Sequence, residues 1–103
     1  MDERHFPKPS MNALVDFLAA QAKMALGAVN HPQTDAPVID LLYAKYAINL
    51  LTLLEEKTAA NATAPEKNYL ENVLYDMRML YLRVENAVKE AEKRAAEEEQ
   101  TEE

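Results

Sequence analysis

The sequence predicts an all-α fold of three antiparallel helices with a long third helix, completed by homo-oligomerisation. Its 103 residues include a single Gly and many Ala, Leu, Glu and Lys, a composition that favours helices over turn-rich β structure. Apolar residues recur at intervals of three and four along three segments, which is the helical period. A chain of this length supports one domain. The apolar faces of its helices are wider than one small body needs, which favours association.

The chain divides into three parts by composition. Residues 1–9 are predicted to form a flexible arm, because Pro7 and Pro9 oppose helix formation. Residues 10–88 form the helical domain, and residues 89–103 a charged, mostly acidic tail that frays. The tail holds seven Glu against two Lys and one Arg, so it carries −4 of the net charge of −7. The folded body is therefore only mildly acidic.

The first helix is predicted over residues 10–26. Ser10 is a good N-cap, and Gly27 suits the left-handed residue that follows a helix. One apolar face recurs at helical spacing, and a second apolar line runs beside it. The main face comprises Met11, Leu14, Val15, Leu18, Ala22, Ala25 and Leu26, and the second line comprises Ala13, Phe17, Ala20 and Met24.

The second helix is predicted over residues 37–58. Asp35 is the expected N-cap, with Pro37 tolerated in the first turn. Apolar side chains between Val38 and Leu54 occupy almost every direction around the axis, so this helix must be covered on several sides. One partner helix on each side is barely available within so short a chain. The pattern therefore favours self-association.

The third helix is predicted over residues 64–95. Thr63 and Glu66 match a capping box, in which each side chain bonds the backbone amide of the other residue. The pairs Glu85/Lys89 and Glu90/Arg94 are spaced to prolong a solvated helix. Apolar residues alternate steps of four and three, as in a coiled-coil seam. This seam comprises Leu70, Val73, Met77, Leu80, Val84, Ala87 and Ala91.

Short stretches in a fixed order carry a resemblance to a known family. They are Phe17-Leu18, Gln21 to Gly27, Lys45 to Ile48, Glu55 to Thr58, Asn61, Thr63, Glu66 and Leu74 to Tyr81. Over Asn12 to Val84 the chain resembles a family of short bacterial helical proteins catalogued only as a domain of unknown function. The resemblance implies a bacterial source and an intracellular helical fold, and it supplies no substrate, cofactor or catalytic residue.

Two positions depart from that family's pattern. Asn49 stands where the family usually has Asp, which removes any role that needs a carboxylate there. Ala60 stands where the family usually has Gly. This change places the left-handed turn residue at Ala60 or Asn61, and Asn tolerates that conformation better.

Composition excludes several function classes. An acidic chain without a Lys/Arg cluster does not suit nucleic acid. There is no Cys, and His5 and His31 lie apart in the arm and a loop, so we expect no metal site and no cofactor. Ser10 and Thr63 are explained as helix caps and have no positioned base. We therefore expect no catalytic residue and no enzyme activity.

The predicted function is that of a cytoplasmic, non-enzymatic interaction or scaffold module without a membrane span. We expect a homo-oligomer, with a dimer favoured, and a possible protein partner bound through the tails. The alternative is a helical bundle that binds a small apolar or aromatic ligand near Tyr43 and Tyr46. The predicted oligomer interface comprises Tyr46, Leu50, Leu53, Leu70, Val73, Met77, Leu80 and Val84.

Overall fold

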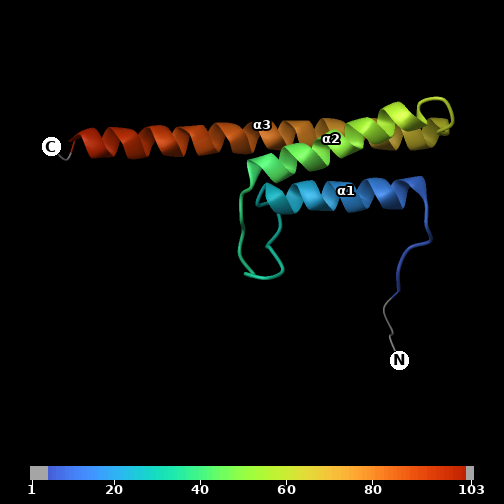
Figure 1. Ribbon diagram of the computed structural model, residues 1–103, viewed down its shortest axis with the longest axis horizontal. Coiled ribbons are helices and arrows are strands. Elements are labelled where there is room, and N and C mark those ends of the chain that lie inside the picture. Colours follow the sequence, from blue (N-terminus) through green and yellow to red (C-terminus); the bar gives the residue numbers. More distant parts are fainter. Residues whose placement is uncertain (1–4, 102–103) are drawn as a thin grey trace.

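The computed structural model describes residues 5–101 and contains three helices, with no strand in that range. They are α1 (Met11–Ala25), α2 (Leu41–Thr58) and α3 (Ala64–Thr101). α1 and α3 run in one direction and α2 runs back between them (Figure 1). Each helix packs against the other two. The predicted all-α, three-helix antiparallel fold is confirmed.

Local signals fix both ends of α1. The Ser10 Oγ accepts a hydrogen bond from the Ala13 amide at 3.0 Å, as predicted for the N-cap. At the other end Gly27 has φ +74°, and the Ala28 amide reaches back to the Lys23 carbonyl at 2.9 Å. This is a Schellman ending, in which a left-handed residue satisfies carbonyls of the last turn.

α2 begins at Leu41, four residues later than predicted, and Asp40 is its N-cap in place of Asp35. The Asp40 Oδ1 accepts from the Tyr43 amide at 3.1 Å. The preceding segment is held extended, because Ile39 pairs with Leu26 and the Asp40 amide donates to the Ala25 carbonyl at 2.8 Å. Asp35 instead sits in a loop turn with φ +49°.

The turn between α2 and α3 is compact. The amides of Asn61 and Ala62 both donate to the Thr58 carbonyl, at 3.1 and 2.8 Å. The prediction of a left-handed residue at Ala60 or Asn61 is wrong, because Asp35 is the non-glycine residue with positive φ within residues 5–101. A turn closed by helical continuation needs no such residue.

The start of α3 has the predicted capping box. The Thr63 amide donates to Glu66 Oε1 at 2.8 Å, and the Glu66 amide donates to Thr63 Oγ1 at 3.3 Å.

The core lies where the three helices meet. Small residues on α1 and α2 let the axes approach closely, and larger side chains of α2 and α3 fill the centre. The buried core comprises Val15, Ala19, Ala22, Ala25, Leu26, Ala44, Ala47, Ile48, Leu51, Leu70, Leu74 and Met77. No buried side chain in the described part of the chain has an unpaired polar atom.

α3 continues to Thr101, six residues beyond its predicted end at residue 95. Its second half projects past the body with no helix beside it (Figure 1). Every residue from 89 to 100 is exposed, so local helix propensity extends this segment without tertiary burial. The Lys89 Nζ lies 3.9 Å from Glu85 Oε1, the predicted spacing for such support. No helix among residues 5–101 is long and apolar enough to span a membrane.

Candidate functional site

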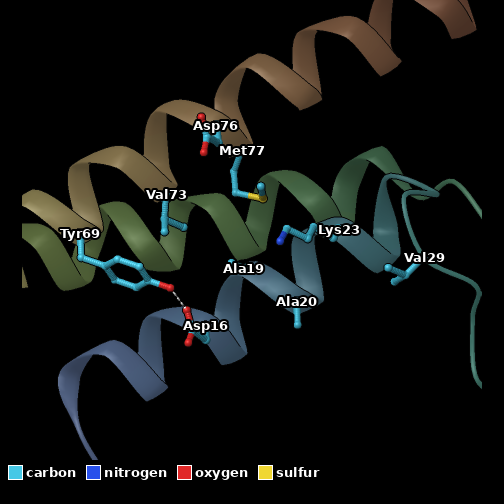
Figure 2. Close-up of a pocket in the computed structure, with 9 residues that line it drawn as sticks. All are labelled: Asp16, Ala19, Ala20, Lys23, Val29, Tyr69, Val73, Asp76 and Met77. Carbon is cyan, nitrogen blue, oxygen red and sulfur yellow. Dashed lines mark hydrogen bonds between the residues drawn. The ribbon is translucent and has the colours of Figure 1, made fainter.

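An open cleft of about 370 Å³ lies between α1 and α3. Figure 2 shows Tyr69 reaching from α3 to Asp16 on α1, where its hydroxyl donates to the carboxylate. That hydrogen bond raises the pKa of Tyr69, with smaller contributions from burial and from the negative charge of Asp16. Lys23 and Asp76 supply the other charges of the cleft. The hydrogen bond of Tyr69 to Asp16 therefore joins α3 to α1.

Side-chain hydrogen bonds also join the other pairs of helices. The Tyr43 hydroxyl donates to Gln21 Oε1 at 2.9 Å, between α2 and α1. The Arg78 Nη2 donates to Thr52 Oγ1 at 3.0 Å, between α3 and α2. These hydrogen bonds connect α1 to α2 and α2 to α3.

The two histidines lie in the places that the sequence indicates. His5 is exposed in the N-terminal arm, and His31 lies in the loop after α1. The His31 Nδ1 accepts from the Gln33 amide at 3.1 Å, so this side chain helps to shape the loop. The described residues contain no group of three His, Cys, Asp or Glu side chains placed to hold a metal ion.

Tyr43 and Tyr46, the residues of the ligand alternative, have ring centroids 6.3 Å apart. Tyr43 lines a surface pocket of about 320 Å³ with Gln21, His31 and Asp40, and Tyr46 is not part of that lining. The pocket is open to solvent rather than enclosed. Ligand binding at this place stays a prediction.

An uncharged apolar surface, here called the α1–α2 face, covers the side of α1 and α2 away from α3. Leu42 is 84% exposed, Phe17 62% and Tyr46 58%, which are large values for apolar or aromatic side chains. Gln21 and Tyr43 tie the two halves of the face together. The face comprises Leu14, Phe17, Gln21, Leu42, Tyr43, Tyr46, Leu50 and Leu53.

A second uncharged surface runs along the back of α3, opposite the core. Its residues recur at steps of four and three, and all of them are exposed. Tyr75 is 65% exposed, Leu82 49% and Met79 40%. This surface, here called the outer stripe, comprises Asn68, Asn72, Tyr75, Met79, Leu82 and Asn86.

The structure divides the predicted interface residues between surface and core. Tyr46 and Leu53 are exposed on α2, and Leu50 beside them is half-buried. The α3 members instead face the chain's own core: Leu70 and Met77 are buried, and Val73, Leu80 and Val84 pack against the core clusters. The large residues of the α3 seam, from Leu70 to Val84, are therefore covered within the chain.

Reading the sequence for apolar seams missed the outer stripe. It has the same heptad spacing as the inner seam but lies half a turn away on the same helix. Three of its six members are Asn, so a search for apolar residues selects the inner seam alone. The available signal was the absence of charge at six successive heptad positions.

A family model described as domain of unknown function (DUF1844) matches residues 8–83. The match begins close to α1 and ends within α3 before its projecting half. It overlaps the segment from Asn12 to Val84 on which the resemblance rests. The chain matches no curated protein and no solved structure.

Proposed function

The chain belongs to the DUF1844 family, whose function is unknown, and from its surfaces we propose that it is a non-enzymatic interaction or scaffold module that self-associates. The observation that carries the proposal is that two uncharged surfaces, the α1–α2 face and the outer stripe, stay exposed in a single copy. A closed core forms without the residues of either surface, and large side chains such as Leu42 and Tyr75 remain exposed on them. Soluble monomers rarely leave such patches uncovered.

A second copy of the chain is the occupant we propose for its uncovered surfaces. A homo-oligomer needs no other component, and −4 of the net charge of −7 lies in residues 89–103, beyond the last residue of either uncharged surface. Mutual repulsion between copies is therefore weak where they would meet. The cysteine-free composition also supports a reducing, cytoplasmic setting.

Sedimentation equilibrium of the full chain at micromolar concentration tests this proposal. We expect a mass of at least twice the monomer mass of 11.7 kDa. A stable monomer at these concentrations would refute self-association.

A pair of variants then tests whether the α1–α2 face is the contact. Replacing both Leu42 and Tyr46 by Ser removes its two most prominent α2 side chains and leaves the core intact. Lys23→Ser, on the α1–α3 side, is the matched control. If the double variant alone becomes monomeric, copies meet through this face; if it keeps its mass, they meet elsewhere.

A further inference from the structure

From the outer stripe we infer that two copies of this chain pair back to back, α3 against α3 and antiparallel. This inference rests on the proposed self-association and names its surface. The stripe lies on the face of α3 opposite Leu70, Leu74 and Met77, which contact α1 and α2. Two bodies could therefore lie on opposite sides of the paired helices without meeting. The heptad spacing of the stripe is the spacing that lets one helix pack along another.

Charged residues flank the stripe in a fixed order. Asp76 and Arg83 lie along one edge, and Glu71, Arg78 and Glu85 lie along the other. All except Glu85 are exposed, and the Glu85 side chain keeps 29% of its exposure. In a helix pair these edge positions face the matching edges of the second helix and select its direction and register.

One antiparallel register makes the edges complementary. With the two-fold axis between Leu80 and Tyr81, each Met79 packs beside Leu82 of the second copy. Asp76 then faces Arg83 of the second copy. Because the axis repeats every contact, this ion pair occurs twice.

The other edge is complementary in the same register. Arg78 faces Glu85 of the second copy, and the two-fold axis repeats this contact. One N–H group of the Arg78 guanidinium donates to Thr52, and the others remain available for Glu85. The one like-charge contact in this register joins Glu71 to Glu92 at the solvated ends, where screening weakens it.

Competing arrangements set like charges against each other. A parallel pair in register places Glu71 against Asp76, Arg78 against Arg83, and Glu85 beside another Glu. Sliding the antiparallel pair by one heptad moves the axis to Met77. Asp76 then faces Asp76 of the second copy, and Arg78 faces Arg78 of the second copy. Electrostatic complementarity fixes orientation and excludes wrong partners, so the charges favour a single geometry.

Charge exchange between two variants tests the pairing. In a dimer of D76R, the new arginine at position 76 of each copy should face Arg83 of the other copy. In a dimer of R83D, the new aspartate at position 83 should face Asp76 of the other copy. We expect at least a tenfold rise in the dimer dissociation constant for each variant by sedimentation equilibrium. An equimolar mixture should regain the wild-type mass, because each chain then meets the opposite charge.

Matched controls change the charge elsewhere by the same amount. Glu56→Arg and Lys57→Asp lie on exposed positions of α2, outside the stripe and its edges, so they should keep the wild-type mass alone and in mixture. Recovery in the D76R and R83D mixture also shows that both variants fold. A mixture that stays monomeric while the wild type dimerises would overturn the inference.

A distance measurement tests the direction of pairing. The chain has no Cys, so Lys67→Cys offers a unique site for a spin label on an exposed position of α3. In the inferred register the two labels are offset by about 40 Å along the helix axes, at about 1.5 Å per residue. In a parallel pair they have no offset, and a short distance would overturn the inference.

Different results would refute self-association and pairing through the outer stripe. A monomeric wild type would refute both. A wild-type dimer that withstands D76R and R83D but dissociates when Leu42 and Tyr46 are replaced would keep the self-association and transfer it to the α1–α2 face.

Discussion

Tyr69 gives the molecule a titratable link between α1 and α3. Its neutral hydroxyl donates to Asp16, and its pKa is raised for that reason first and by burial second. A group with a raised pKa in the folded state contributes its stability fully below the unfolded pKa of about 10 and loses it as the pH rises through the folded pKa.

We therefore predict that Tyr69→Phe lowers the free energy of unfolding by about 1 kcal/mol at neutral pH, the usual contribution of one hydrogen bond. The difference between wild type and variant should shrink when the pH is raised well above 10. Urea denaturation followed by circular dichroism at neutral and strongly alkaline pH measures it. A difference that stays constant with pH would contradict the assigned role of the Asp16 contact.

At the level of single elements, the start of α2 shows how a distant contact overrides a local signal. Asp35 followed by Pro37 resembles a helix start, and the helix would then include Val38 and Ile39. Ile39 instead pairs with Leu26, which postpones the helix to the next capping residue, Asp40. Gly27 contributes to this arrangement, because a Cβ at its position would lie 3.3 Å from Ile39 Cγ1.

Substitution of the two aspartates separates their roles. Asp40→Ala removes the side chain that accepts from the Tyr43 amide and should lower the free energy of unfolding by about 1 kcal/mol. Asp35→Gly should change it by less than about 0.5 kcal/mol or raise it, because Gly adopts a positive φ without strain. Thermal denaturation of the two variants beside the wild type measures both. An equal loss for both would argue that the loop residue also supports the helix.

Signals contained within one turn of chain could be predicted from the sequence. Ser10, Gly27 and the box of Thr63 and Glu66 act on amides or carbonyls a few residues away, and each lies where the sequence places it. The outer stripe could not be found in the same way. Its Asn residues look like ordinary surface residues in the sequence. Their common face becomes evident only when the core identifies the side of α3 that points to solvent.

At the scale of the whole molecule, α3 has two halves with different support. The half up to Val84 packs against α1 and α2, whereas the half beyond Val88 is exposed along its length. Helix propensity maintains the second half, with the Glu85–Lys89 ion pair at its start. The predicted helix ended too early, at residue 95, because helix-favouring Ala, Glu, Lys, Arg and Gln residues continue without a break to Gln100.

We predict that a chain ending at Val88 keeps its free energy of unfolding within about 0.5 kcal/mol of the full chain, because the missing residues contribute no core contact. It should also keep its self-association, since Glu85 and Asn86 remain. Chemical denaturation and sedimentation equilibrium of the shortened chain measure the two quantities. A large loss of stability would show that the projecting half contacts the body of its own chain.

The projecting half of α3 also determines how the molecule moves through water. The radius of gyration is 17.6 Å, against about 13 Å for a compact domain of this length. A rod that extends beyond its body raises the frictional coefficient without adding much mass. A single copy should therefore leave a gel-filtration column earlier than a globular protein of 11.7 kDa, in the range expected of a larger particle. The shortened chain should lose most of this excess friction, which gives the extended shape a hydrodynamic signature of its own.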